Sequence, residues 1–465
     1  MTDPAAHGVA LLDNYWAPTL SFALSLGRRG IPLHFYGRGA GRWSRYCTRR
    51  MSCPPIEDAE RFVPWLEQRV RSGEISRLAP TSDLIAYYLA LLRHLFPPEV
   101  QRTIAPLAEI EQCLIKTRFA SACQRVGQAV PTALTPEDPE GALAAAEQLG
   151  YPLILKPKSH LAIGNDERGT VVRDRRALLA AFRSYPVVPG QEAIARRYPE
   201  LLWPLLQRYI PSARRRVYSV SGIKDAQSGV VTAALSVKRW QWPPGNGIST
   251  SQVSHNNATI LAAGITAVDK LLSRGLFELE LLLHHSELLA IDLNPRAFGF
   301  IALDLALGND LPWLWYQSTR QVLTPLAPPA ARPILEARFS IPHAVGRGIL
   351  RLFGRRFPAG PRSRHGSAPR SVLSMLGHWS DPIPLLVSNA RLLRHPGGLM
   401  RPFLAAARQE KERQHHAPTP ALRSGEHLTS DEVEQLLSAG QRGRHGARDR
   451  TTPGTILDQS GREVA

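Results

Sequence analysis

Residues 275–296 alternate apolar and polar side chains on both sides of a short polar centre, a pattern that is typical of a β-hairpin. A register centred on Ser286 places Glu280 directly opposite Asp292. Period-two alternation then gathers one set of polar side chains on a single face, namely Glu278, Glu280, Asp292 and Asn294. The other face carries Phe277, Leu279, Leu281, Ile291 and Leu293. The pattern therefore predicts a hairpin with one apolar face and one face of clustered oxygen atoms.

Two carboxylates that lie opposite each other on neighbouring strands repel, and burial increases the cost. A cation relieves this repulsion. Mg²⁺ takes oxygen ligands from carboxylates and amide carbonyls, and usually keeps phosphate oxygens and waters as its other ligands. Glu280, Asp292 and Asn294 supply such a set. Taken alone, the hairpin also fits a simpler interpretation, in which these residues form the solvated polar face of an edge hairpin.

The first part of the chain predicts an α/β unit. Apolar runs of strand length at residues 8–13 and 31–37 flank a helical pattern at residues 18–27, which favours a parallel strand pair joined by a crossover helix. The segment around Pro80 resembles the end of another strand entering a turn. Further helices are predicted at residues 62–71, 84–95, 111–127, 138–149 and 259–272. Strands are predicted at residues 151–157, 205–210, 217–223 and 229–237, besides the two strands of the hairpin.

Beyond about residue 325 the pattern weakens into connections rich in Pro and Arg. Short helices are predicted at residues 344–353, 371–376 and 400–414. A capping-box spacing at Thr429–Glu432 predicts one more helix, through Leu437. The rest of the chain from about residue 415 is rich in His, Pro, Gly, Ser and Arg, which favours disorder.

The chain has 465 residues and a globular composition, too long for one compact core, so we expect two or three domains. Its net charge is +18, and almost all of the basic excess is Arg. Residues 338–370 hold eight Arg and no acidic residue, so they either dock on phosphates of nucleic acid or of an anionic membrane surface, or form a solvated basic face. Aromatic-basic RNA motifs and helix-turn-helix spacing are absent from the sequence, so no specific nucleic-acid partner is expected.

Other function classes are disfavoured by the residues themselves. The four cysteines fit neither a zinc knuckle nor a redox pair, and a reduced, cytoplasmic chain is the expectation. We expect no secretory signal, because no Lys or Arg precedes the first apolar stretch, and no transmembrane segment, because the longest uncharged run contains Pro, Asn and Gln. The sequence also offers no Ser/His/Asp or Cys/His set for nucleophilic catalysis.

Lysine is scarce, so its positions are informative. Lys116 lies near the start of a predicted helix, Lys156 ends a predicted strand, and Lys238 follows another strand just before a Pro-Pro-Gly-Asn-Gly loop. At the end of an element an ammonium group can reach a phosphate while its stem packs on apolar surface. Taken singly, each of the three also fits the simpler interpretation of a surface lysine. Together with the acidic hairpin they indicate a site for phosphate and metal.

In their order and spacing these segments resemble the ATP-grasp superfamily, specifically its carboxylate-amine ligase branch with a preATP-grasp domain in front, over about residues 8–325. The segment from Lys116 through Gly127 to Pro131 is similar to the family's Lys followed by Gly-x-x-x-Pro. YPLILKP is similar to the strand whose Lys touches the ATP phosphates, which implies that role for Lys156. Lys238 and the Pro-Pro pair after it are similar to a Lys-Arg-x-x-Pro-Pro loop of this branch.

Two further segments carry the resemblance. LLQRYIPS resembles the hinge strand that brackets adenine through backbone hydrogen bonds, which implies nucleotide-binding roles for Gln207, Arg208, Tyr209 and Ile210. The hairpin resembles the metal-binding strands, which carry an acid on the first strand and Glu-x-Asn-x-Arg on the second. By position these residues are Glu280, Asp292, Asn294 and Arg296.

The sequence departs from the family pattern in three places. Asp292 replaces the usual Glu, which draws a bridging carboxylate back by one methylene. Arg208 stands where an acidic residue is common, and the phosphate-covering loop contains only Gly164 and Gly169. These departures leave an alternative open: a catalytically weakened, ATP-binding homologue that acts as a binding protein through its Arg-rich C-terminal region.

What the resemblance implies about fold is an α/β (α+β) protein with a Rossmann-like preATP-grasp domain, a two-lobed ATP-grasp fold and a mainly helical basic C-terminal extension. The expected boundaries are residues 1–108 for the preATP-grasp domain, 109–200 for the first lobe, 201–325 for the second lobe with the hairpin, 326–414 for the basic extension and 415–465 for a largely disordered tail.

The chemistry implied by the resemblance is amide formation between a small-molecule carboxylate and an amine, through an acyl phosphate, with ATP converted to ADP and phosphate. ATP and Mg²⁺ are the expected cofactors, with Mn²⁺ as an alternative metal, and dimers are common among such proteins. The metal ligands would be Glu280, Asp292 and Asn294. Lys238 would hold the polyphosphate with Lys156, and Arg296 would stabilise the anionic intermediate and the leaving phosphate. The substrates themselves are not indicated.

Overall fold

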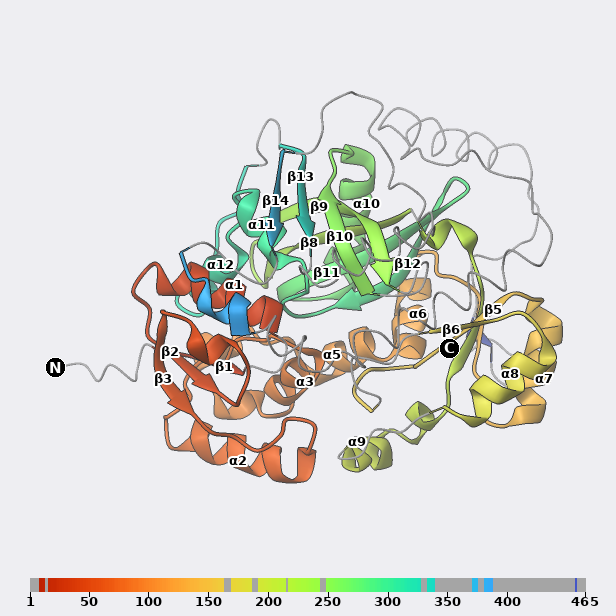
Figure 1. Cartoon of the computed structure of the whole chain (residues 1–465), viewed down its shortest axis with the longest axis horizontal. Helices are drawn as coiled ribbons and strands as arrows, with labels where there is room; N and C mark the ends of the chain where they lie inside the picture. The colour runs from red at the N-terminus through yellow and green to blue at the C-terminus, as the bar shows by residue number, and fades with distance from the viewer. Residues whose placement is uncertain are drawn as a thin grey trace.

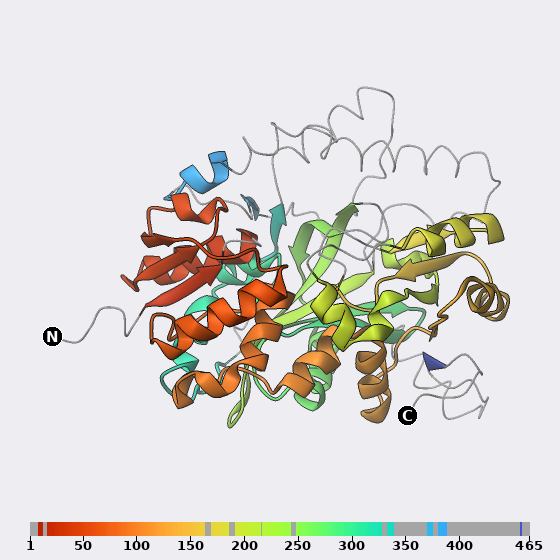
Figure 2. The same ribbon diagram turned by 90° about the horizontal axis from the view of Figure 1, so that it is seen from below.

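The computed structural model describes residues 8–12, 16–162, 169–185, 191–214, 216–242, 248–327, 333–338, 370–374, 380–387 and 456–457. A small α/β domain lies at one end of the molecule, a smaller lobe with its own sheet lies at the other, and a large sheet lies between them (Figures 1 and 2). Within these residues, no helix has both the length and the apolar character needed to cross a bilayer.

The N-terminal domain is built on a parallel sheet of order β1-β2-β3, formed by Val9–Leu12, Leu33–Tyr36 and Cys47–Met51. Helix α1 (Trp16–Gly27) connects β1 to β2, which confirms the predicted parallel pair. The strand predicted to end near Pro80 is reduced to a single parallel bridge between Ala10 and Leu78. The elements that follow β3 are α2 (Ala59–Arg71), α3 (Asp83–Leu91), η3 (Arg93–Leu95) and α4 (Pro98–Gln101), and η2 (Gly41–Trp43) precedes it.

The helix predicted at residues 111–127 is in fact two helices, α5 (Leu107–Leu114) and α6 (Lys116–Arg125). They are separated by Ile115, which is fully buried and extended, with φ −102° and ψ 110°. The backbone N–H of Lys116 donates to the carbonyl of Lys158, at 2.8 Å, instead of continuing the helix. A tertiary hydrogen bond therefore interrupts a continuous helical pattern and starts α6 at Lys116.

The first lobe carries a sheet of order β15-β4-β7-β5-β6. Its strands are β4 (Ala133–Leu134), β5 (Leu153–Lys156), β6 (Thr170–Val172), β7 (Leu205–Arg208) and β15 (Ile456–Leu457). Its helices are α7 (Pro139–Leu149), α8 (Arg175–Arg183), α9 (Glu192–Arg197) and η4 (Pro199–Leu202). Strand β7 follows the predicted boundary at residue 200 but pairs with β4 and β5, so this sheet extends past that boundary.

The large sheet has the order β12-β11-β8-β9-β10-β13-β14 and is antiparallel apart from its last pair. Its strands are β8 (Val217–Asp225), β9 (Gly229–Trp242), β10 (Ile248–Ser254), β11 (Gly275–His284), β12 (Glu287–Asn294), β13 (Leu335–Arg338) and β14 (Arg370–Ser374). The accompanying helices are η5 (Pro211–Arg214), α10 (Ala258–Leu271), α11 (Ile301–Ala306) and α12 (Leu311–Ser318).

One apolar core joins the N-terminal domain to the large sheet. Side chains of α1, β1 and β2 pack with side chains of α11, α12, β8 and β11 in a single buried cluster. Within it, Phe22 and Trp315 meet edge to face, with ring centroids 5.4 Å apart. The N-terminal domain is therefore fixed against the sheet that carries the hairpin.

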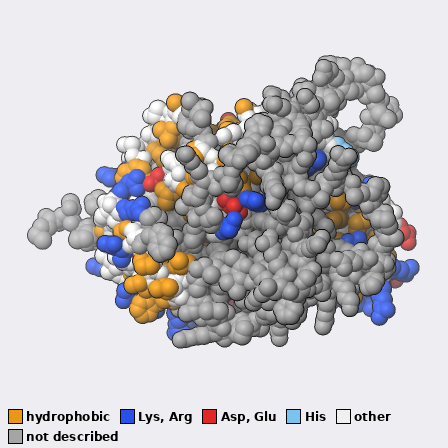
Figure 3. All heavy atoms as spheres, turned by 45° about the horizontal axis from the view of Figure 1, so that its top comes forward, with side chains coloured by type: hydrophobic (Ala, Val, Ile, Leu, Met, Phe, Trp, Pro, Cys, Tyr) orange, Lys and Arg blue, Asp and Glu red, His pale blue; other side chains and the backbone are white. Residues whose placement is uncertain are grey.

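The C-terminal predictions are only partly covered by the described residues. Residues 370–374 form strand β14, paired in parallel with β13, so the helix predicted at residues 371–376 is wrong there. An available sheet edge overrides weak helical spacing in so short a segment. The helices predicted at residues 344–353, 400–414 and 429–437 lie outside the described residues, as does most of the Arg-rich stretch and of the predicted tail. On the face in Figure 3, the described Lys and Arg side chains lie in several separate places among uncharged ones.

Candidate active site

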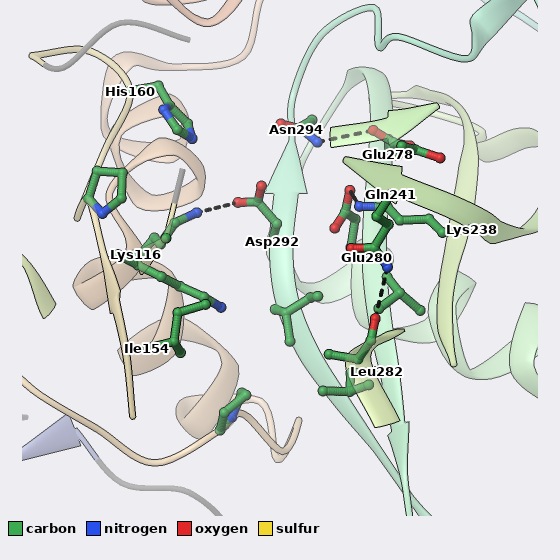
Figure 4. A pocket seen from close by; sticks show the side chains of 18 of the residues that line it. Lys116, Ile154, His160, Lys238, Gln241, Glu278, Glu280, Leu282, Asp292 and Asn294 are labelled. Atoms are coloured by element: carbon green, nitrogen blue, oxygen red, sulfur yellow. Dashed lines mark hydrogen bonds and ion pairs between the residues drawn. The ribbon is translucent and has the colours of Figure 1, made fainter. Parts of the chain in front are cut away.

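A cavity of about 220 Å³ lies where the hairpin, the first lobe and the N-terminal domain meet. In Figure 4 Lys116 and Ile154 face the hairpin side chains across this cavity. All the residues that the sequence singled out line it: Lys116, Lys156, Gln207, Arg208, Tyr209, Ile210, Lys238, Glu280, Asp292, Asn294 and Arg296. The structure thus brings together residues from β5, β7, β9, β11, β12 and the start of α6.

The hairpin register agrees with the prediction where the acidic residues lie. Glu280 pairs with Asp292 across β11 and β12, and the next pair on that face is Glu278 with Asn294. These side chains all line the cavity. The period-two argument was sufficient here, because both strands are regular from their outer ends to this point.

Nearer the turn the prediction fails by one residue. Leu281 pairs with Ala290, so Ile291 has no partner on β11 and forms a β-bulge. The last pair before the turn is consequently His284 with Glu287, and the register is not centred on Ser286 throughout. Ile291 lines the cavity together with Leu282, so its predicted place on the apolar face is wrong. An extra residue of this kind leaves no mark on the alternation of the sequence.

The carboxylates on the hairpin are held by ammonium groups from other elements. Lys116 Nζ lies 3.0 Å from Asp292 Oδ1, and Lys238 Nζ lies 2.6 Å from Glu280 Oε1 (Figure 4). Burial raises the pKa of Asp292, but the positive charges of Lys116, His160 and Arg296 together outweigh burial, and the pKa falls to about 2. The expected repulsion between the two acids is therefore relieved by cations that belong to the chain itself.

Lys156 lies at the end of β5, with its ammonium group directed to the neighbouring strand β7. Its Nζ donates to Gln207 Oε1, at 2.8 Å. Burial, and then the positive charge of Lys116, lower the pKa of Lys156 to about 8. Among the described residues its partner is thus a neutral amide, which suits an ammonium that is to accept an anionic ligand.

The predicted hinge, Gln207–Ile210, begins in the last two residues of β7 and continues past the end of that strand. The side chain of Arg208 is exposed, whereas Gln207 and Tyr209 are buried. The N–H of Tyr209 donates to the carbonyl of Pro152, at 3.0 Å, which ties the segment to the start of β5. Beside it, apolar side chains of Ile154, Ile210, Leu282 and Ile291 line the cavity. In Figure 4, Ile154 and Leu282 lie at the opposite end from His160 and Asn294, so the cavity has an apolar end and a polar end.

At the polar end a chain of hydrogen bonds runs from the hairpin into the N-terminal domain. Glu278 Oε2 accepts from Asn294 Nδ2 at 3.1 Å, and Asn294 Oδ1 accepts from Arg296 Nη2 at 3.0 Å. Arg296 Nε in turn lies 2.7 Å from Asp83 Oδ1. Burial, and then Glu280, raise the pKa of Glu278 to about 7, whereas at Asp83 burial is outweighed by Arg296 together with His160, which lower its pKa.

Two titratable side chains that line this cavity, Asp83 and His160, were not identified from the sequence. Asp83 follows Ser82, whose side chain caps α3, and it lines the cavity from the N-terminal domain. The Thr-Ser-Asp turn after a short apolar run was a usable signal, since functional groups collect in the loops that follow strands of α/β units. His160 lies in the loop after β5 and faces Asp292 in Figure 4. A single histidine in a loop gives no signal of this kind.

The donor set determines what the cavity can hold. In the part of the chain that the structure describes, no three His, Cys, Asp or Glu side chains converge on one metal position. The predicted ligands on the hairpin are the carboxylates of Glu280 and Asp292 and the amide oxygen of Asn294, a set that suits a hard cation only if other oxygens complete its shell. Phosphate oxygens meet that need, and lysine ammonium groups beside the carboxylates meet the charge of a polyphosphate. The residues therefore fit Mg²⁺ bound together with a nucleotide, and fit an isolated metal ion poorly.

No protein-family model matches the sequence. Solved structures resemble the fold. The biotin carboxylase domain dimer of 2-oxoglutarate carboxylase from Hydrogenobacter thermophilus, solved with MgADP, ADP and bicarbonate, matches with a TM-score of 0.54 and 14% identity over 69% of this chain and 71% of its own. N5-carboxyaminoimidazole synthetase from Staphylococcus aureus matches with a TM-score of 0.52 and 12% identity, over 75% and 85%. L-amino acid ligase from Bacillus licheniformis matches with a TM-score of 0.50 and 17% identity, over 71% and 79%.

These neighbours are all ATP-grasp enzymes with a preATP-grasp domain. The matches cover 69% and 75% of this chain, and the shared mixed α/β architecture confirms the predicted fold class. At such low identity the likeness concerns the fold and leaves substrates open. The chain has the ATP-grasp fold, preceded by a preATP-grasp domain.

Proposed function

We propose that this protein is an ATP-dependent ligase that joins a carboxylate to an amine through an acyl phosphate. The observation that carries the proposal is the convergence of two carboxylates and an amide on one hairpin with three lysines from separate elements, around one cavity in an ATP-grasp fold. The neighbours support the same reaction class, since one is an L-amino acid ligase and another was solved with MgADP and bicarbonate.

The cavity is suited to a nucleotide in one orientation. Its apolar end, lined by Ile154, Ile210, Leu282 and Ile291, fits an adenine ring, and the ammonium groups of Lys116, Lys156 and Lys238 fit the phosphates. We assign Glu280, Asp292 and Asn294 as the ligands of Mg²⁺ that binds with the nucleotide. When bound, Mg²⁺ neutralises charge that develops on the transferred phosphoryl group.

Binding of the nucleotide with its metal amounts to an exchange of partners. Before binding, Lys116 pairs with Asp292 and Lys238 pairs with Glu280. On binding, the ammonium groups turn to phosphate oxygens and the carboxylates are released for the metal. Each of these four side chains has a partner of opposite charge both before and after binding, so the exchange leaves none of them buried without compensation.

The chain's residues then act on the substrates as follows. A carboxylate oxygen attacks the γ-phosphorus, the bond to the bridging oxygen breaks, and ADP leaves while Lys156 and Lys238 hold the polyphosphate. The amine attacks the carbonyl carbon of the acyl phosphate, loses a proton, and phosphate departs with the bonding electron pair. Arg296, beside Asn294 at the polar end, stabilises the anionic intermediate and the leaving phosphate. No nucleophilic side chain takes part.

The test is a screen of small carboxylates and amines, amino acids first, for Mg²⁺-dependent release of ADP by the purified full-length protein. We expect ADP and phosphate to form in equal amounts with the right pair, and both to be lost in Glu280→Ala and Asn294→Ala. Glu67→Gln is the matched control, because Glu67 forms an exposed ion pair with Arg71, at 2.8 Å, away from the cavity. Turnover that is unchanged in both cavity variants would contradict the assignment.

A further inference from the structure

Glu278 is a carboxylate in the cavity wall that the proposed metal set does not include. It lies on the same face of β11 as Glu280, two residues away, and opposite Asn294 on β12. Its side chain is deeply buried, and 6% of the residue is exposed. In the cavity its Oε2 accepts a hydrogen bond from the Asn294 amide, at 3.1 Å. A buried carboxylate at this place needs an explanation, because it adds a third acid beside two others.

The contact bears on the orientation of the Asn294 side chain. The oxygen and nitrogen ends of an amide have almost the same shape, so hydrogen-bond partners decide which end points where. As a carboxylate, Glu278 accepts from the NH₂ end, and Arg296, which has no acceptor, can only donate to the oxygen end, at 3.0 Å. Inverting the amide would set oxygen against carboxylate and NH₂ against guanidinium. Both neighbours therefore select the same orientation.

That orientation matters for a metal. The carbonyl oxygen of an amide has two lone pairs, and Arg296 takes one of them. The second is available to a cation only while the oxygen end stays on the side of Arg296. Partners that orient a metal ligand in this way commonly change metal affinity by about 10- to 100-fold when they are removed.

We propose that Glu278 is a positioning residue of the metal site, which holds the Asn294 amide with its oxygen presented to the cation. The inference rests on the proposed function, in which Asn294 Oδ1 is a ligand of Mg²⁺ bound with the nucleotide. Glu278 acts through Asn294 and touches neither metal nor nucleotide. Removal of the Glu278 carboxylate should raise the Mg²⁺ concentration that is needed to support nucleotide binding. It should leave nucleotide binding in the absence of metal unchanged.

Three variants distinguish this positioning role from two others, namely direct coordination of the metal by Glu278 and a purely structural role. Glu278→Met keeps the length of the side chain and removes the acceptor. Glu278→Gln removes the charge and keeps an oxygen that can accept from Asn294. Glu278→Met combined with Asn294→Ala tests whether the two side chains act through each other. Glu67→Gln serves again as the control, and thermal unfolding is recorded for every variant.

The readout is binding of a non-hydrolysable ATP analogue to the full-length protein by calorimetry, at a series of Mg²⁺ concentrations. We expect Glu278→Met to raise the half-saturating Mg²⁺ concentration about tenfold or more. Glu278→Gln should stay within about threefold of the wild type, because the amide can replace the acceptor. In the Asn294→Ala background, Glu278→Met should add nothing.

Three results would overturn the positioning role. They are wild-type behaviour of Glu278→Met, an equal loss in Glu278→Gln and Glu278→Met, and a loss that persists in the Asn294→Ala background. The second would make the carboxylate itself a ligand, and the third would make its role purely structural. If wild-type protein shows no Mg²⁺-dependent binding of the analogue, the proposed function fails and the positioning role fails with it.

A structure of the wild-type protein with Mg²⁺ and the analogue gives a second measurement that does not require Glu278→Met to fold. We expect Asn294 Oδ1 at about 2.1 Å from the metal and Glu278 within hydrogen-bond distance of Nδ2. A Glu278 oxygen in the metal's coordination shell, or an inverted Asn294 amide, would overturn the proposal.

Discussion

Arg296 and Asp83 connect two domains across the polar end of the cavity, with Arg296 Nε 2.7 Å from Asp83 Oδ1. Asp83 lies in the first turn of α3 in the N-terminal domain, and Arg296 directly follows the hairpin. Both side chains are largely buried. The N-terminal domain thus contributes a charged group to the proposed site and holds the guanidinium that we assign to the second half of the reaction.

We predict that Asp83→Asn lowers the turnover number about tenfold or more, because a misplaced guanidinium no longer meets the intermediate. The KM for ATP should stay within about twofold, since Asp83 lies at the polar end of the cavity, away from the adenine-binding end. Steady-state ADP release with the substrate pair found in the screen checks this. Asp269→Asn is the matched control, because it removes an ion pair with Lys224, at 2.9 Å, outside the cavity. Equal effects in both variants would contradict a specific role for Asp83.

We predict that nucleotide binding takes up protons near pH 8 through Lys156. Its pKa is lowered to about 8 in the free protein, chiefly by burial, so part of the population is neutral at that pH. A bound polyphosphate favours the charged form and raises the pKa, so protons are taken up and affinity falls as the pH rises above 8. Calorimetry at pH 8 in buffers of different ionisation enthalpy measures the uptake. Lys156→Arg, which stays charged, should abolish it, and persistence of the uptake in that variant would assign it to another group.

We predict a pH-dependent contribution of Asp292 to stability. Burial raises its pKa, but Lys116, with His160 and Arg296, outweighs burial, and the pKa is depressed from 3.8 to about 2 in the folded protein. A depressed pKa stabilises the fold fully above the unfolded value, and the stabilisation disappears as the pH falls through the folded value. The difference in free energy of unfolding between wild type and Asp292→Asn should therefore be constant from about pH 5 upward and shrink towards pH 2. Urea unfolding at pH 6, 4 and 3 checks it, and a difference independent of pH would contradict the pairing.

We predict that Gly264→Ala destabilises the protein by about 1–3 kcal/mol through overpacking. A Cβ at Gly264 would lie 2.5 Å from Cγ2 of Val220, which is fully buried on β8. The helix α10 would then have to move away from the sheet. Urea unfolding at neutral pH measures the loss, and Thr266→Ala on the exposed side of the same helix should stay within about 0.5 kcal/mol of the wild type. A stable Gly264→Ala variant would show that α10 can shift without cost.

Much of the site could be predicted from the sequence because it depends on local patterns. The alternation along residues 275–296 was sufficient to pair Glu280 with Asp292, and the scarcity of lysine drew attention to Lys116, Lys156 and Lys238. Residues at the ends of neighbouring strands lie close together in the folded domain, so the strand pattern by itself was enough to predict that these lysines converge. The order of the segments then pointed to the ATP-grasp fold, which the comparisons with solved structures confirm.

The remainder depends on contacts between distant parts of the chain. Asp83 and Arg296 are 213 residues apart, and their meeting depends on how the N-terminal domain packs on the large sheet. The break between α5 and α6 depends on a hydrogen bond from Lys116 to the carbonyl of Lys158, which no helical pattern records. The bulge at Ile291 is likewise set by the partner strand. Periodicity describes a segment by itself, and these features belong to pairs of segments.

The bulge at Ile291 also places a change of register between β11 and β12 on the way from the ligand-bearing residues to the turn. Glu278 and Glu280 pair with Ser221 and Ser219 of β8, and β11 keeps this register with β8 past the bulge as far as Leu282, so the shift concerns β12 alone. The turn is therefore a practical attachment point: a fluorophore or peptide tag inserted between His285 and Ser286 would report on the protein without altering the chemistry at the other end of the strands.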